Sequence, residues 1–255
     1  MDPHNHSQSS SSPPTVTNRP LAVLVLIAVA IWLIRSQGGC EGAGVEQSVR
    51  PGINAEFLSG TDVSKWVERF EGESREIFRH RMRIVDDADI LTGQSIADVG
   101  AGTGLFTFLF AQAVGPSGTV YAVDISEEFT TLIRERAKEL GLTHVVTVRN
   151  SQRSVDLPAE SVDVVFICDT YHHFEYPEST LASIHKALRP GGQLLVIDFK
   201  RIEDVSRAWV LEHVRAGQEV FSDEIIAAGF EPDESPDAEY LEENYYLRFR
   251  KPHEK

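Results

Sequence analysis

The chain has 255 residues, of which 42% are hydrophobic, and a formal net charge of -15 at pH 7. That length is enough to bury one full hydrophobic core, so one globular domain is expected once the N-terminus is set aside. The negative charge disfavours a nucleic-acid substrate, and the two cysteines, Cys40 and Cys168, lack the C-x-x-C spacing that would indicate a disulfide framework or a zinc site.

The first sixty residues differ in composition from the rest. Residues 1–20 are rich in Ser and Pro and poor in apolar side chains, which predicts disorder. Residues 21–34, LAVLVLIAVAIWLI, carry no charged or hydroxyl side chain. Residues 35–60 contain Gly, Ser and charged residues and are predicted to be a linker, so the folded domain is expected over residues 61–255.

The apolar run at residues 21–34 predicts association with a membrane. It is shorter than the roughly 20 residues of a usual spanning helix, and it fits the roughly 7 to 15 apolar residues of a signal peptide. An uncleaved single-pass anchor is favoured over a cleaved signal or a lipoprotein that begins at Cys40. Arg19 and Arg35 bracket the run without a charge bias, so the side of the membrane stays open.

An amphipathic helix is predicted over residues 66–86, where Trp66, Phe70, Ile77 and Ile84 recur at helical spacing. Four residues of this helix are expected to form a solvated charged face, and the alternative is a lid that faces the substrate. These residues are Arg75, Glu76, His80 and Arg81.

Strands and helices are predicted to alternate from residue 95 onward. The strands cover residues 95–99, 119–123, 145–148, 162–168 and 193–199. The helices cover residues 104–113, 127–140 and 178–188. The strand VDVVFIC is apolar almost throughout, as expected of a strand buried on both faces of a parallel sheet. The pattern predicts a doubly wound α/β domain that binds its ligand beyond the carboxyl ends of the strands.

A glycine-rich loop follows the first of these strands. In IADVGAGTGLFTFLF, Asp98 precedes Gly100, Gly102 and Gly104, and a helix follows. A strand, a glycine loop and a helix N-terminus form a nucleotide-binding arrangement. The dinucleotide fingerprint requires a glycine where this chain has Leu105, which disfavours a nicotinamide cofactor.

Four segments occur in an order typical of one enzyme family: DVGAGTG, TVYAVDIS ending near Asp124, VDLPAESVDVVF and ALRPGGQLLVIDF. Together they resemble the class I S-adenosylmethionine-dependent methyltransferases over roughly residues 71–251. The resemblance implies a Rossmann-like, doubly wound, mostly parallel seven-stranded sheet with helices on both faces and an antiparallel last strand. It also implies S-adenosyl-L-methionine as the cofactor and a methyltransferase domain over residues 61–255. Residues 222–230 resemble the family's last helix, and residues 245–250 resemble its final antiparallel strand.

The resemblance assigns the cofactor-binding residues. The loop at Gly100, Ala101, Gly102 and Gly104 approaches the methionine part, and Asp98 meets its ammonium group directly or through water. Asp124 accepts both ribose hydroxyls. Ile125, Gln152 and Asp169 complete the predicted cofactor site, with Gln152 or Asn150 near the adenine. Ser126 is expected to cap the next helix.

The segment CDTYHHFEYP is expected to lie against the reactive methyl group, with Tyr171 and His172 as the predicted catalytic residues. His172 serves as general base if the acceptor carries a proton. A metal bound by His172 and His173 is not predicted, because adjacent side chains diverge and the sequence shows no third ligand nearby.

The predicted function is methyl transfer from S-adenosylmethionine to a small molecule, either lipid-soluble or a thiol. No nucleic-acid partner is expected, and the sequence leaves the oligomeric state open. The alternatives are a non-catalytic S-adenosylmethionine-binding protein and, less favoured, a nicotinamide-dependent oxidoreductase.

Overall fold

The computed structural model describes residues 45–60, 62–72 and 75–253. The predicted disorder of residues 1–20, the apolar run at 21–34 and the first part of the linker lie outside these residues. Among the described residues, no helix combines the length and apolar character needed to cross a membrane. The folded unit runs from Glu46 to Lys255, so residues 46–60 belong to the domain and not to a linker.

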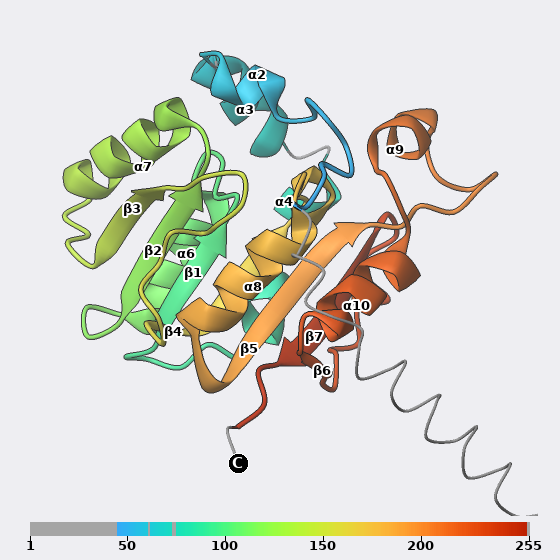
Figure 1. The fold of residues 1–255 in the computed structure, drawn as a ribbon. Coiled ribbons are helices and arrows are strands. Elements are labelled where there is room, and N and C mark those ends of the chain that lie inside the picture. The colour runs from blue at the N-terminus through green and yellow to red at the C-terminus, as the bar shows by residue number, and fades with distance from the viewer. Residues whose placement is uncertain (1–44, 61, 73–74, 254–255) are drawn as a thin grey trace, which may run out of the picture. The chain divides into compact units, whose positions relative to one another are not determined.

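One seven-stranded sheet forms the centre of this unit, in the order β3-β2-β1-β4-β5-β7-β6 (Figure 1). The first five strands pair in parallel, whereas β7 runs antiparallel to both β5 and β6. This arrangement confirms the predicted fold, including its antiparallel last strand. The strands are β1 (Ser95–Val99), β2 (Thr119–Asp124), β3 (Val145–Arg149), β4 (Val162–Cys168), β5 (Leu188–Phe199), β6 (Glu231–Pro232) and β7 (Asn244–Arg250).

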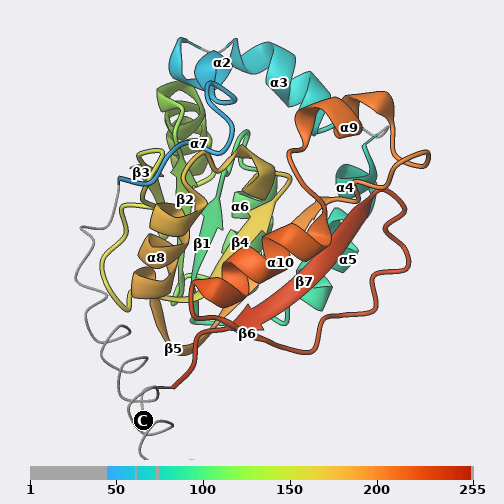
Figure 2. The same ribbon diagram turned by 45° about the vertical axis from the view of Figure 1, so that its right-hand side comes forward.

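Helices cover both faces of the sheet (Figures 1 and 2). Because successive strand residues point to opposite faces, β4 contributes to two cores. Val164 and Phe166 pack in one core with residues of α5 (Arg81–Asp87) and α6 (Leu105–Val114). Val165 and Ile167 pack in the other core with residues of α8 (Pro177–Ala187) and α10 (Gln218–Ala227). This two-sided burial explains the nearly continuous apolar run of β4.

The helix α7 (Glu127–Glu139) packs on β2 through Ile133 and Ala122. Ser126 is its N-cap, since the Ser126 hydroxyl accepts a hydrogen bond from the backbone N–H of Phe129 at 3.4 Å. The expectation that Ser126 caps this helix is confirmed. A further short helix, α9 (Ala208–His213), was not predicted and follows β5.

The single helix predicted over residues 66–86 is wrong. The chain forms three shorter helices there: α3 (Val63–Phe70), α4 (Glu76–Arg79) and α5. Between α3 and α4, Gly72 disfavours a continuous helix, and Arg75 adopts an extended conformation with φ -86° and ψ 127°.

The break between α3 and α4 turns Arg75 and Glu76 toward the domain. The Glu76 side chain is buried, and its carboxylate accepts hydrogen bonds from three successive backbone N–H groups at the start of β7, those of Glu242, Glu243 and Asn244. The predicted solvated face is therefore wrong for Glu76.

Candidate functional site

A cleft opens at the carboxyl ends of β1, β2 and β4, beside the point where the strand order reverses. It contains about 680 Å³ of space, open solvent at its mouth included, which lies within the usual size of a small-molecule site. Six of the predicted cofactor residues line it: Gly100, Gly102, Asp124, Ile125, Gln152 and Asp169. Ala101, Gly104 and Asp98 do not line the cleft.

The glycine loop after β1 is tightly packed. Gly100 has a φ of +75°, and a Cβ at this position would lie 2.2 Å from Cγ2 of Thr170. Gly104 has a φ of +87° and immediately precedes α6. Glycine is required at Gly100 for both conformation and space, so the loop can bring its backbone close to a ligand.

Asp124 joins this loop to the end of β2. One carboxylate oxygen accepts a hydrogen bond from the backbone N–H of Gly102, and the other accepts one from the N–H of Ser126, both at 2.8 Å. Burial raises the pKa of Asp124 to about 6. A carboxylate fixed by two backbone groups at the edge of a cleft is suited to accept hydrogen bonds from a pair of ribose hydroxyls.

Asp98 lies behind the loop. It is buried and accepts a hydrogen bond from the Thr107 hydroxyl at 2.6 Å. Burial raises the pKa of Asp98 to about 7, against the opposing effect of the Thr107 hydrogen bond. Because Asp98 does not line the cleft, its interaction with the ammonium group of the cofactor, directly or through water, stays a prediction.

Aromatic side chains from the N-terminal segment cover the cleft. Phe57 of α2 (Ala55–Leu58) and Phe70 of α3 line it, and Trp66 lies between them with ring centroids 5.1 Å and 4.9 Å away. Figures 1 and 2 show α2 and α3 above the carboxyl ends of the strands. Phe57 was not predicted as a site residue because it falls in the predicted linker.

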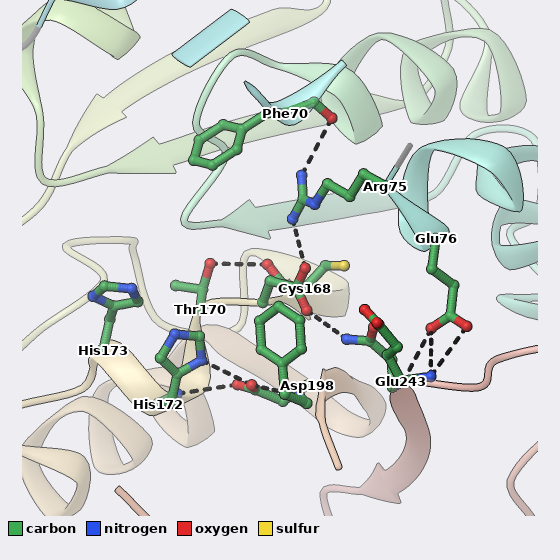
Figure 3. Close-up of polar contacts among 12 residues, drawn as sticks. Phe70, Arg75, Glu76, Cys168, Thr170, His172, His173, Asp198 and Glu243 are labelled. Carbon is green, nitrogen blue, oxygen red and sulfur yellow. Dashed lines mark hydrogen bonds and ion pairs between the residues drawn. The ribbon is translucent and has the colours of Figure 1, made fainter. Parts of the chain in front are cut away.

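An ion pair connects this N-terminal segment to the end of β4. Nη2 of Arg75 lies 2.5 Å from Oδ2 of Asp169, and Asn244 of β7 donates a hydrogen bond to Oδ1 at 2.6 Å (Figure 3). Burial raises the pKa of Asp169, and the Arg75 charge opposes that rise. Arg75 thus pairs with a residue that lines the cleft and is not on a solvated face.

The two predicted catalytic residues lie in a 3-10 turn, η1 (Tyr171–His173), but neither lines the cleft. Tyr171 is fully buried, and its hydroxyl donates a hydrogen bond to Glu224 at 2.9 Å in the core under α10. His172 is 1% exposed and donates from Nδ1 to Asp198 at 2.8 Å. His173 lines the cleft instead, so the geometry gives the acceptor-side position to His173.

Known proteins resemble this chain in both sequence and fold. A family model described as a methyltransferase domain matches residues 97–196. The ubiquinone/menaquinone biosynthesis C-methyltransferase UbiE of Escherichia fergusonii is 30% identical over 128 residues, which is 49% of this chain and 51% of that protein. UbiE of Pasteurella multocida is 31% identical over 118 residues, 46% of this chain and 44% of that protein.

Solved structures agree with these matches. A SAM-dependent methyltransferase from Aquifex aeolicus superposes with a TM-score of 0.65 and 25% identity, over 75% of this chain and 100% of its own. Together, the family model and the solved structures support a class I S-adenosylmethionine-dependent methyltransferase family for this chain. They imply S-adenosyl-L-methionine as its cofactor, as the sequence predicts. The fold is shared by an S-adenosylmethionine-dependent methyltransferase from Mesorhizobium loti. That structure is 17% identical to this chain and superposes with a TM-score of 0.55, over 70% of this chain and 99% of its own.

The chain spans about half the length of the UbiE relatives that it matches.

Both residues predicted to lie near the adenine, Asn150 and Gln152, line the cleft. Gln152 accepts a hydrogen bond from the Asn54 side chain at 3.3 Å. Asn150 donates to the backbone carbonyls of Ser151 and Ser154.

Three histidines lie together where η1 meets the cleft. The rings of His172 and His173 lie 4.4 Å apart, so the divergence expected of adjacent side chains does not occur in this 3-10 turn. His213, the last residue of α9, places its Nε2 3.3 Å from Nε2 of His173. His213 was not predicted as a site residue because it lies forty residues farther along, in a helix that was not predicted either.

Proposed function

We propose that this methyltransferase is an active enzyme that transfers the methyl group of S-adenosylmethionine to a small molecule. The observation that carries the proposal is a single cleft that joins the Gly100 loop and Asp124 to an aromatic compartment bounded by Phe57, Phe70 and His173. In the reaction, the acceptor's lone pair or carbanion bonds to the methyl carbon while the carbon–sulfur bond breaks and the sulfonium becomes a thioether. Such an in-line displacement depends mainly on alignment of the two substrates.

The cofactor is proposed to lie with its ribose on Asp124, its methionine part along the loop and its adenine near Asn150 and Gln152. Its sulfonium and ammonium charges are attracted by the negative charge of Asp124 and, at a longer distance, of Asp98. The methyl group then points toward η1, where His173 meets the cleft. His173 is in a better position than His172 to accept a proton from the acceptor.

A small acceptor is supported by the aromatic cover over the cleft. Phe57, Phe70, Phe129 and Phe174 line the cleft and offer flat apolar surfaces. The UbiE relatives are named for methylation in quinone biosynthesis, and a lipid-soluble ring would suit these surfaces. We therefore propose a lipid-soluble acceptor, with a small thiol as the second class to be tested.

A lipid-soluble acceptor would be reached most directly from a membrane surface. We propose that residues 21–34 anchor the chain there, with the catalytic domain on the side that holds S-adenosylmethionine. Deletion of residues 1–39 should move the protein from the membrane fraction to the supernatant, and mass spectrometry of the mature N-terminus would reveal cleavage. A full-length chain found only in the supernatant would contradict the anchor.

The activity can be tested in two steps with the purified full chain. Calorimetry should show binding of S-adenosylmethionine and its demethylated product, and no binding of NAD. Incubation with methyl-labelled cofactor and either a lipid extract or a mixture of small thiols should then label a compound in the lipid extract. Cofactor binding without any labelled product in either mixture would favour the non-catalytic binding protein, and binding of NAD alone would overturn the proposal.

A further inference from the structure

The three histidines beside the cleft have the spacing of metal ligands. One ring nitrogen from each of His172, His173 and His213 lies within 4.8 Å of those of the other two. The Nε2 atoms of His173 and His213 are 3.3 Å apart. Two nitrogens bound to one tetrahedral zinc ion at about 2.05 Å are about 3.3 Å from each other, so this pair already has the separation that a shared ion requires.

Hydrogen bonds from outside the cluster fix two of the rings in a ligand-competent tautomer. The Asp198 carboxylate can only accept, so His172 carries its proton on Nδ1 and leaves Nε2 with a free lone pair. The Asn54 side-chain N–H groups donate to the His173 carbonyl and to Gln152, so its oxygen accepts from Nδ1 of His173 at 3.2 Å. Carboxylate and carbonyl partners of this kind orient most metal-binding histidines.

The Nε2 atom of His172 is the strongest single indication. It is fully buried and, within the described part of the chain, has no hydrogen-bond partner. The His172 side chain is 1% exposed, and its Asp198 partner is 0% exposed. A buried acceptor without a donor is unfavourable, and such a group in a folded protein requires an explanation. A bound cation would satisfy this lone pair.

We propose that His172, His173 and His213 bind one divalent transition-metal ion, with zinc as the best fit, and leave a fourth position open toward the cleft that His173 lines. Three imidazoles and one open position form the ligand set of a catalytic zinc site, whereas magnesium and calcium prefer oxygen ligands.

The open position gives the ion a role in the proposed methyl transfer, and this step rests on the proposed function. A thiol or hydroxyl acceptor binds the ion through its heteroatom and releases its proton to water, because the ion lowers its pKa. The heteroatom's lone pair then forms the bond to the methyl carbon, and the carbon–sulfur bond of the cofactor breaks. His172 and His173 are metal ligands in this scheme and not general bases.

Metal binding can be measured without the cofactor. The full chain is stripped of metal with a chelator, dialysed and titrated with Co²⁺, which gives visible absorption in a four-coordinate site. Zn²⁺ is then added in competition, and Mg²⁺ serves as the ion that should not bind.

Three variants are compared with the wild type. His213→Ala removes one proposed ligand, and Asn54→Ala keeps all three ligands. His185→Ala is the matched control, because His185 is a half-buried histidine outside the cluster. Thermal melting confirms that each variant is folded.

The proposal expects one equivalent of tightly bound ion in the wild-type chain and in His185→Ala. Asn54→Ala should weaken binding about tenfold, as expected for loss of an orienting partner, and His213→Ala should weaken it more. Equal affinity of His213→Ala and wild type, or no Co²⁺ or Zn²⁺ binding by the wild type, would overturn the site. Calorimetry and methyl-transfer assays with S-adenosylmethionine on the same stripped chain separate this inference from the proposed function. Cofactor binding and full methyl transfer without metal would remove the ion's role in the reaction and leave the proposed function standing. Metal binding through His213 without cofactor binding would remove only the proposed function.

Discussion

The two ends of the cleft are built in different ways. The end proposed to bind the cofactor, here called the cofactor end, is local, because β1 and β2 are neighbours and Val99 pairs with Val123, which places the loop at Gly100 beside Asp124. The end proposed to bind the acceptor, here called the acceptor end, draws Asn54, His173 and His213 from segments that are far apart in the chain. A ligand site made by two adjacent strands can be recognised from a short motif, whereas a site made by distant segments exists only after tertiary packing.

This contrast predicts that the two ends can be altered separately. Changes at the loop or at Asp124 should alter the dissociation constant of S-adenosylmethionine. Changes at the histidines should lower the rate of methyl transfer and leave the affinity for the cofactor nearly intact. Substitutions and a change of pH can test this separation.

The largest effect is expected for Gly100→Ala, compared with Gly141→Ala. Both glycines have a φ near +70°, at +75° and +70°, but a Cβ at Gly100 would meet Thr170 at 2.2 Å, whereas nothing lies within 4 Å at Gly141. Gly141→Ala should lose about 1–2 kcal/mol of unfolding free energy through backbone strain alone. Gly100→Ala should lose about 1–3 kcal/mol more through overpacking, together with cofactor binding.

Urea unfolding and calorimetry with S-adenosylmethionine would measure both quantities for the two glycine variants. Equal losses of stability would show that the loop can move away from Thr170 and that its tight packing is not what shapes the cofactor end.

The next effect is expected for Asp124→Ala, which removes the carboxylate proposed to hold the ribose. The dissociation constant of S-adenosylmethionine should rise by about 30-fold, or about 2 kcal/mol, through loss of charge-assisted hydrogen bonds. Asp86→Ala, an exposed aspartate on α5, is the matched control and should bind as the wild type does. An unchanged dissociation constant in Asp124→Ala, in a variant that remains folded, would remove Asp124 from the cofactor site.

The same contrast explains how much could be predicted from the sequence. Alternating apolar strands and helices with short turns specify the sheet, and the spacing of Asp98, Gly100 and Asp124 identifies the cofactor end, because these signals are contiguous. The break between α3 and α4 was missed because the apolar spacing continues across Gly72. The roles of Arg75 and Glu76 depend on partners that are distant in the chain. Arg75 pairs with a residue that follows β4, 94 residues away, and Glu76 binds the start of β7, 168 residues away, so no local pattern reveals these contacts.

The histidine pair shows the same limit within two residues. The sequence places His172 and His173 after β4 but cannot say which ring enters the cleft. That choice depends on Asp198 of β5, which binds both the backbone N–H and the ring of His172. Asn54 correspondingly holds His173 at the cleft.

His172→Ala and His173→Ala should therefore differ. His172→Ala leaves the fully buried Asp198 carboxylate with only backbone donors. A buried polar group that loses a partner costs roughly 1–3 kcal/mol, and because backbone donors remain, the free energy of unfolding should fall by an amount near the lower end of this range. His173→Ala should keep more of its stability and cofactor affinity but lower methyl transfer. Full transfer activity in His173→Ala, with a loss only in His172→Ala, would restore His172 as the residue that meets the acceptor.

The smallest expected effect is a pH dependence of cofactor affinity. Burial raises the pKa of Asp98 to about 7 in the ligand-free protein. The charged fraction of such a group falls from about three quarters at pH 7.5 to about one quarter at pH 6.5, which should weaken the binding of the positively charged cofactor about threefold. Asp98→Asn should remove the contribution of Asp98 to this pH dependence and leave the contributions of other titrating groups unchanged.

The stability of the ligand-free protein should change in the opposite direction. The carboxyls of Asp98 and Asp124, with pKa values of about 7 and 6, bind more protons in the folded state than in the unfolded state, where such groups titrate near 4. Their contribution to stability is therefore present below about pH 4 and is lost as the pH rises toward 7. Melting curves at pH 6.5 and 7.5 should show a larger stabilisation by S-adenosylmethionine at the higher pH. If the stabilisation is equal at both values, and equal again in Asp98→Asn, then Asp98 does not interact with the cofactor, and the cofactor end is confined to the residues that line the cleft.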